Sequence, residues 1–85
     1  MYYFYVIKSE LDDRLYFGYT SDLKNRIHQH NNGESRYTKK FKPWKLIYCE
    51  AYSNKSLAQK RERQIKQGGK VYTQLKKRLF PEKES

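Results

Sequence analysis

The chain has 85 residues, of which 36% are hydrophobic and 16% aromatic, and this length excludes a second domain with a core of its own. A count of 19 Lys and Arg against 9 Asp and Glu gives a net charge of +10. This charge favours DNA or RNA as partner over an acidic membrane surface, and a basic surface that only aids solubility is the alternative.

The first two elements predicted along the chain are strands. Residues 2–7 carry an aromatic or β-branched side chain at every position, which is typical of a central strand covered on both faces. The acidic stretch around Asp12 and Asp13 then favours a turn, and residues 14–20 are again strand-like. We therefore expect an antiparallel hairpin.

The pattern after this hairpin predicts a helix over residues 22–32. Thr20 and Ser21 are residue types that cap helix N-termini, and Leu23 and Ile27 stand four apart, as in one buried stripe. A strand, a cap and a helix are thus expected to follow one another without a spacer.

Arg26 and His30 are also four residues apart and flank the apolar stripe of this helix. They are therefore expected to point toward the sheet. Together with Tyr16, they place a phenol, a guanidinium and an imidazole at one junction between strand and helix.

The middle of the chain predicts a loop and a third strand. Residues 34–43 lack hydrophobic periodicity and are rich in Lys and Arg, so we expect a basic surface loop. Residues 44–52 alternate in polarity, as a strand does, with one side expected to carry Leu46, Tyr48 and Tyr52.

Two helices are expected to follow this strand. Ser53 or Asn54 caps the first of them, and Gly68-Gly69 ends it. Its apolar stripe is formed by Leu57, Ala58 and Ile65. The last helix has an apolar residue at every fourth position, at Val71, Leu75 and Leu79.

The order ββαβαα predicts an α+β protein, in which a small three-stranded antiparallel sheet is flanked by helices. We expect one domain over residues 1–80 and a disordered tail over residues 81–85.

The positive charge is concentrated in the second half of the chain. Between residues 36 and 80 the only acids are Glu50 and Glu62, against 14 Lys and Arg. Cys49 is the only cysteine, which excludes an internal disulfide, and no apolar stretch has the length of a membrane span. We therefore expect a cytoplasmic protein that has no membrane partner and binds nucleic acid.

Five elements stand in a specific order and spacing. They are Tyr3-Phe4-Tyr5, Tyr16-Phe17-Gly18, Arg26, His30 and Glu62. The set resembles the GIY-YIG endonuclease family, in the compact form of single-domain relatives of the nuclease domain of the repair protein UvrC. The resemblance covers residues 2–66, and each triplet alone is weak in a chain with nine tyrosines.

This resemblance implies a divalent-metal-dependent endonuclease that hydrolyses phosphodiester bonds in DNA, in repair or DNA processing. Tyr16 is assigned as the general base or as the group that positions the nucleophile, with Tyr5 beside it. Arg26 is assigned to the phosphate, and His30 as a proton carrier or phosphate donor. Glu62 is assigned to one ion, Mg²⁺ or Mn²⁺. A phenol has a pKa of about 10, so it needs nearby positive charge to act as a base.

Further basic residues are expected to contact the DNA, for which branched and single-stranded forms are the candidates. In the loop over residues 34–43 they are Arg36, Lys39, Lys40 and Lys42, and a solvated loop is the alternative. Arg61 lies closer to the centre of the apolar helix face than Glu62, and is expected to reach the site as a second phosphate ligand. We expect a monomer or weak dimer and a protein partner that supplies specificity.

Each candidate also has a purely structural interpretation. The two tyrosines would be core aromatics, and Arg26 would cover its apolar neighbours with its aliphatic stem. His30 would interact with the carbonyl end of its helix, and Glu62 would pair with Lys66 one turn away.

Departures from the family pattern keep a second function open. Tyr3 and Phe4 stand where the family name has Gly and Ile, and Phe17 replaces an Ile. Many catalytic members carry an asparagine beyond the metal-binding glutamate, whereas no asparagine follows Asn54 in this chain. The alternative function is therefore a catalytically weak or inactive nucleic-acid-binding module of the same fold.

Overall fold

The computed structural model describes residues 1–81. In chain order its elements are β1 (Tyr2–Ser9), β2 (Leu15–Thr20), α1 (Leu23–Asn31), the 3₁₀ helix η1 (Thr38–Phe41), β3 (Trp44–Tyr52), α2 (Lys55–Gln67) and α3 (Gly69–Leu79). The expected order ββαβαα is confirmed, with η1 added before β3. The expected tail lies, from residue 82 onward, outside the described residues.

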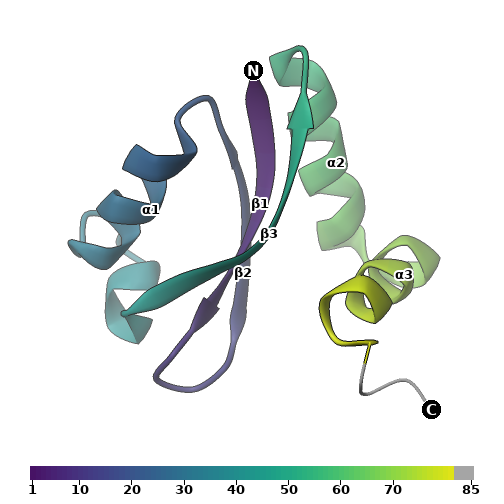
Figure 1. Cartoon of the computed structure of the whole chain (residues 1–85). Helices are drawn as coiled ribbons and strands as arrows, with labels where there is room; N and C mark the ends of the chain where they lie inside the picture. The colour runs from purple at the N-terminus through teal and green to yellow at the C-terminus, as the bar shows by residue number, and fades with distance from the viewer. Residues whose placement is uncertain (82–85) are drawn as a thin grey trace.

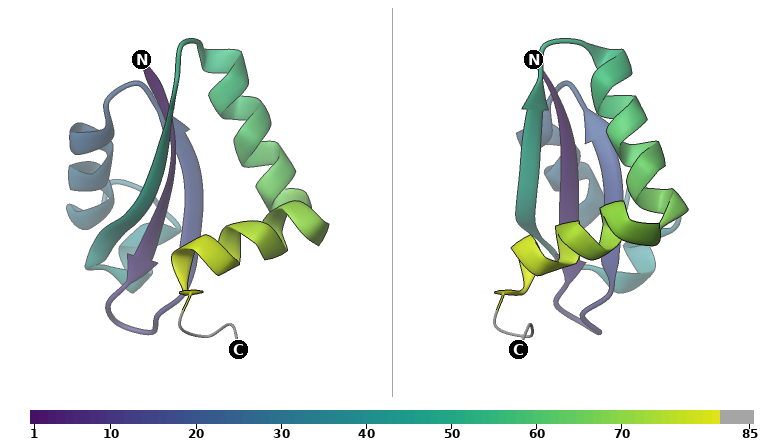
Figure 2. Two further views of the ribbon diagram at one scale, coloured as in Figure 1. Left: turned by 45° about the vertical axis from the view of Figure 1, so that its right-hand side comes forward. Right: turned by 90° about the vertical axis from the view of Figure 1, so that its right-hand side faces the viewer.

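The three strands form an antiparallel sheet in the order β2-β1-β3, as expected. Helices α2 and α3 cover one face of this sheet, and α1 and η1 cover the other (Figures 1 and 2). The central strand β1 can lie between these layers because its side chains are apolar on both sides, and Phe4, Tyr5, Val6 and Ile7 are at most 1% exposed.

The alternation of β1 divides the core into two clusters. The cluster toward α2 and α3 contains Phe4, Val6, Ile65 and Leu75. The cluster toward α1 contains Tyr5, Ile7 and Trp44, with Leu23 and Ile27 packed against it. Successive strand residues point to opposite faces, so Tyr5 belongs to the α1 side while its two neighbours belong to the α2 side.

The two expected helix caps had different outcomes. Asn54 caps α2 as expected, and its side-chain oxygen accepts a hydrogen bond from the backbone N–H of Leu57 at 3.0 Å. At α1 the expected caps Thr20 and Ser21 are wrong. The cap is Asp22, because its carboxylate accepts from the Asn25 N–H at 3.1 Å, and the Thr20 hydroxyl bonds to the backbone of Asp22 instead.

The expected alternation of β3 is wrong at one point. The register of β3 against β1 shifts between Val6 and Ile7, as at a β-bulge. As a result Ile47 packs against the same cluster as Tyr48, whereas Leu46 is 37% exposed and lines a hollow beside α1.

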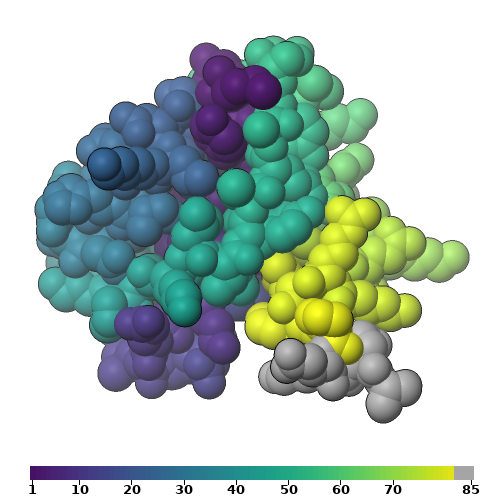
Figure 3. Space-filling view, in the orientation of Figure 1, coloured from purple at the N-terminus to yellow at the C-terminus, as the bar shows by residue number. Residues whose placement is uncertain are grey.

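The expected stripe of α2 is wrong at Leu57, which is 44% exposed, because the helix meets the sheet through Ala58 and Ile65. The stripe of α3 has Leu75 at its buried centre. Seen from the front, β3 forms a continuous surface band between α1 and α3 (Figure 3). Among residues 1–81, no helix is long and apolar enough to cross a membrane.

Candidate active site

Tyr5 of β1 lies directly over Gly18 of β2, its partner across the ladder. A Cβ atom added at Gly18 would stand 2.5 Å from the phenol oxygen of Tyr5, a distance that no real contact tolerates. The absence of a side chain at residue 18 therefore leaves room for the Tyr5 ring. Since β2 is an edge strand, the phenol is placed near the side of the sheet.

A buried chain of hydrogen bonds begins at this phenol. The Tyr5 hydroxyl lies 2.9 Å from Nε2 of His30, and Nδ1 of His30 lies 2.7 Å from the Thr38 hydroxyl. His30 and Thr38 are both fully buried. Burial first, and the charge of Arg26 second, lower the pKa of His30 to about 4, so the ring is neutral at pH 7. Because both ring nitrogens have partners inside the protein, His30 is not placed to hold a phosphate.

Tyr16 is half-buried in an aromatic cluster, beside the hydrogen bonds that join Tyr5, His30 and Thr38. Its ring centroid lies 5.2 Å from that of His30 and 6.2 Å from that of Trp44. The ring of Tyr37 stacks on that of Tyr16, with ring centroids 5.9 Å apart. The two tyrosines of the sequence motif therefore both contact the same histidine, since Tyr5 and His30 also have ring centroids 5.9 Å apart.

Arg26 and Glu62 both act electrostatically on Tyr5. Burial raises the pKa of the Tyr5 phenol, and the Arg26 guanidinium opposes this shift, whereas Tyr16 and Glu62 add to it. Arg26 comes from α1 and Glu62 from α2, which lie on opposite faces of the sheet (Figure 2).

The neighbours of Glu62 place it at the β2 edge. Its side chain is 19% exposed, and its carboxylate lies 3.6 Å from the ammonium group of Lys66, one turn along α2. That ammonium group in turn lies 5.8 Å from the ring centroid of Tyr16. Side chains from both faces of the sheet thus meet around the edge strand that carries Tyr16 and Gly18.

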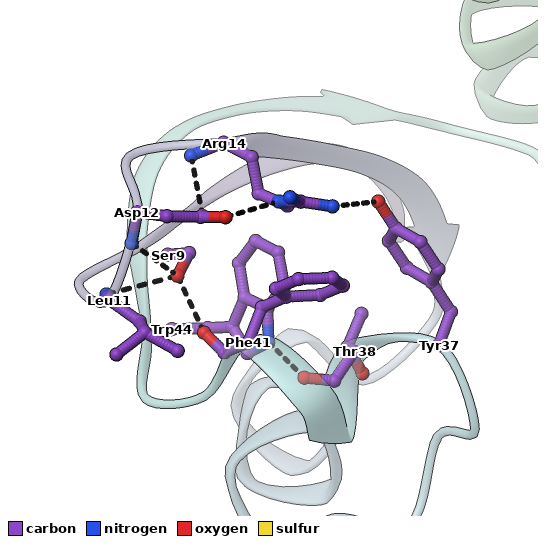
Figure 4. Close-up of polar contacts among 8 residues, drawn as sticks. All are labelled: Ser9, Leu11, Asp12, Arg14, Tyr37, Thr38, Phe41 and Trp44. Atoms are coloured by element: carbon purple, nitrogen blue, oxygen red, sulfur yellow. Dashed lines mark hydrogen bonds and ion pairs between the residues drawn. The ribbon is translucent and has the colours of Figure 1, made fainter.

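The segment over residues 34–43, where we expected a basic surface loop, contains the 3₁₀ helix η1 and is held in place by side-chain contacts. The guanidinium carbon of Arg14 lies 3.5 Å from the ring centroid of Phe41, and Arg14 donates to the Tyr37 hydroxyl at 3.2 Å (Figure 4). The Trp44 indole N–H donates to the Thr38 carbonyl at 2.7 Å. Sequence reasoning missed Thr38, and only the aromatic residues around it signal an ordered segment.

The predicted DNA-contacting residues differ in their surroundings. Four of them are exposed on the segment just described: Arg36, Lys39, Lys40 and Lys42. Arg61 is not brought to the tyrosines. Its guanidinium donates from Nε and Nη2 to the two carboxylate oxygens of Glu50 on β3, at 2.8 and 3.1 Å.

A metal ion at this site would have one protein carboxylate. Residues 1–81 contain no group of three or more His, Cys, Asp or Glu side chains placed to hold an ion. A single carboxylate beside a phosphate position suits Mg²⁺, which commonly keeps several waters and takes one or two carboxylates plus substrate phosphates. Glu62 fits that pattern, since Lys66 is its only ion-pair partner among the described residues.

Two hollows of about 590 Å³ lie beside α1, and neither is lined by Tyr5, Tyr16 or Glu62. These hollows are therefore separate from the predicted catalytic side chains.

The fold and this geometry define a small α+β domain with a tyrosine pair across its first hairpin. The model of the GIY-YIG catalytic domain matches residues 1–77, and the chain belongs to this family. The family consists of endonucleases that act on DNA.

The relatives of the chain are small proteins of similar length. A UPF0213 protein of Staphylococcus saprophyticus is 46% identical over 76% of this chain and 79% of its own length. A UPF0213 protein of Staphylococcus aureus is 42% identical over 96% of both chains. The solution NMR structure of a UPF0213 protein from Bacillus halodurans is 28% identical, with a TM-score of 0.52 over 88% of this chain and 81% of that one.

Proposed function

We propose that the protein is a divalent-metal-dependent endonuclease that hydrolyses phosphodiester bonds in DNA during repair or DNA processing. One observation carries the proposal. Five side chains from β1, β2, α1 and α2 converge around the edge strand β2, and they are Tyr5, Tyr16, Arg26, His30 and Glu62.

Phosphodiester hydrolysis needs an activated water, neutralisation of the charge that grows on the phosphate, and help for the leaving oxygen. Tyr16 is the half-buried phenol of the pair, so we assign it the contact with the water nucleophile. Arg26 carries the positive charge that acts on the Tyr5 phenol, and we assign it to the phosphate.

Tyr5 and His30 have a supporting role. Burial raises the pKa of Tyr5, so this phenol keeps its proton at neutral pH and acts as a hydrogen-bonding group. His30 is neutral and bonded to both Tyr5 and Thr38, so it orients the phenol and can pass a proton along the buried chain. Of the two roles implied for His30, the proton carrier is therefore favoured over the phosphate donor.

Glu62 would hold one Mg²⁺ or Mn²⁺ ion. When bound, that ion supplies charge neutralisation at the phosphate and lowers the pKa of a coordinated water. The ammonium group of Lys66 lies 3.6 Å from this carboxylate.

The test is nicking of supercoiled plasmid by the pure protein with Mg²⁺ or Mn²⁺. Tyr16→Phe and Glu62→Gln are expected to slow nicking by about 10²-fold or more, the range typical of lost acid–base or charge-stabilising groups. Tyr19→Phe, on the same strand, and Glu34→Gln, at an exposed position, are matched controls expected to cut at the parental rate. Nicking that survives unchanged in both site variants would refute the assignment.

A second function is favoured by one sequence feature. No asparagine follows Asn54, so the chain lacks the residue that many catalytic family members carry beyond the glutamate. The second candidate is therefore a DNA-binding module that has lost cleavage. Binding of the parent protein to DNA without any cutting, across both metals and a range of DNA structures, would select it.

A further inference from the structure

Arg61 and Glu50 form a shielded ion pair on the side of α2 away from Tyr5 and Tyr16. Their side chains are 19% and 17% exposed, and both carboxylate oxygens of Glu50 accept from the guanidinium. Tyr48 and Tyr52 also donate their hydroxyls to Glu50, the latter at 2.6 Å. Glu50 therefore receives four hydrogen bonds, one from each of two phenols and two from the guanidinium.

This arrangement limits what the pair can bind. An ionised carboxylate has about four acceptor positions, so Glu50 has none left for a metal ion. The Nε–Nη2 edge of the Arg61 guanidinium is committed to Glu50, in the bidentate geometry that matches one carboxylate. The pair is thus an internal contact, although its two members are the types of residue that bind metals and phosphates.

The position of Arg61 on α2 suggests what the contact does. Ala58 and Ile65, both at most 1% exposed, mark the centre of the helix face that meets the sheet. At 3.6 residues per turn, Arg61 and Glu62 fall on opposite sides of this centre line. Arg61 is bonded to β3, and Glu62 lies toward the β2 edge, so the two residues serve opposite edges of the sheet.

We propose that the Glu50–Arg61 pair is a positioning device for Glu62. Apolar contacts alone would let α2 rotate or slide on the sheet, because hydrophobic burial is not directional. A bidentate ion pair fixes both the rotation and the axial position of the helix at residue 61, and thereby the neighbouring carboxylate. This inference rests on the proposed function, in which Glu62 binds the metal ion.

The experiment measures Mn²⁺ affinity of the metal-free full chain by water proton relaxation, without DNA and without turnover. Glu50→Gln keeps the shape of the side chain but removes its charge, and Arg61→Lys keeps the charge but removes the fork. Both are expected to weaken Mn²⁺ binding roughly 10-fold, as residues that orient a metal ligand commonly do. Arg63→Lys, an exposed position on the same helix, is the matched control and is expected to bind as the parent does.

A second readout separates positioning from plain stability. Half-maximal nicking by the two variants is expected to require more Mg²⁺, and the rate is expected to recover as Mg²⁺ is raised. If Glu50→Gln does not fold, Arg61→Lys and Tyr52→Phe, which removes one of the four bonds, carry the test. Lower thermal stability with an unchanged Mn²⁺ affinity in the folded variants would overturn the inference.

The outcome for Glu62→Gln distinguishes the two proposals. Loss of Mn²⁺ binding in Glu62→Gln, with parental binding in Glu50→Gln and Arg61→Lys, overturns only the positioning role. Parental Mn²⁺ binding in Glu62→Gln overturns the metal assignment on which the proposed function depends.

Discussion

The imidazole of His30 lies fully buried between the Tyr5 phenol and the Thr38 hydroxyl. Burial holds its pKa at about 4, below the usual value of 6.5, because a charged ring would lose its hydration, and the positive charge of Arg26 adds repulsion. The folded protein therefore favours neutral His30, and protonation of this group opposes folding.

The sign of the pH dependence follows from this lowered pKa. Between pH 6.5 and about 4 the unfolded chain binds more protons than the folded one, so stability falls as the pH falls. We expect about 2 kcal/mol of unfolding free energy to be lost between pH 7 and pH 5. Urea unfolding at several pH values measures this loss of unfolding free energy. His30→Gln is expected to flatten the dependence of the unfolding free energy on pH, whereas His28→Gln, at an exposed position, should leave it unchanged. The same pH dependence in both variants would contradict the assignment of this effect to His30.

Gly18 gives a second prediction for single residues. Ala at this position is expected to displace the buried Tyr5 ring, because the added Cβ would stand 2.5 to 2.9 Å from three ring and hydroxyl atoms. Overpacking of this kind commonly costs about 1–3 kcal/mol. We expect a lower melting temperature. We also expect slower nicking at temperatures where the variant is still fully folded, because the displaced Tyr5 ring disturbs the site. A Gly18→Ala protein with parental nicking would show that the position of Tyr5 is not critical.

The sequence predicted which candidate residues come near one another, but not all of their hydrogen-bond partners. Tyr5, Tyr16 and Arg26 are near one another because a strand pair and the helix after it were recognised correctly. For Arg61, helical periodicity gives the face on which a side chain lies, but it cannot show that Glu50 on another element occupies the guanidinium. Thr38 was missed because a buried hydroxyl leaves no pattern in a single sequence.

At the scale of elements, the segment over residues 34–43 is joined to the site through η1. Thr38 bonds to His30 with its hydroxyl and accepts from Trp44 with its carbonyl. Tyr37 stacks on Tyr16 and is bonded to Arg14 (Figure 4). The order of this segment and the geometry of the tyrosine pair are therefore linked.

Thr38→Val tests this link with a side chain of nearly the same shape. It leaves a buried nitrogen of His30 without its partner, which commonly costs about 1–3 kcal/mol. We expect lower stability together with slower nicking, because Tyr5 loses the histidine orientation that supports it. Thr73→Val on α3, where the threonine is exposed, is the control for adding a valine. Unfolding and nicking measurements on Thr38→Val that match the parent would show that the hydroxyl is dispensable.

Periodicity predicted the existence and order of the elements better than their details. Helix α2 and its Asn54 cap follow from local sequence, since the cap bonds only three residues ahead. The shift in β3 does not, because it depends on how Ile47 fits against a strand far away in sequence. Local sequence therefore predicts where helices and strands occur, whereas the exposure of Leu46 and Leu57 depends on tertiary packing.

At the scale of the whole molecule, the net charge of +10 predicts binding to DNA that weakens with salt. Each neutralised phosphate adds about 0.9 to the slope of log affinity against log salt. Lys39 and Lys40 lie on the segment beside the tyrosines, whereas Lys76 and Lys77 lie on α3.

Replacing both lysines of one pair by Gln removes the same charge at two different places. We expect the pair near the site to reduce the salt slope by as much as about 1.8, and the α3 pair to change it less. Fluorescence anisotropy of labelled DNA over a salt series measures the slopes. Equal changes for both pairs would indicate a diffuse charge effect with no preferred contact surface.

We propose that side chains from both faces of the sheet form one metal-dependent site at the β2 edge. An anomalous difference map from crystals of the protein grown with Mn²⁺ and a DNA oligonucleotide tests this proposal. We expect one Mn²⁺ ion bonded to the Glu62 carboxylate, with a DNA phosphate between this ion and the Tyr16 hydroxyl. A well-ordered phosphate at Tyr16, with the Mn²⁺ ion bound away from the Glu62 carboxylate, would contradict this proposal.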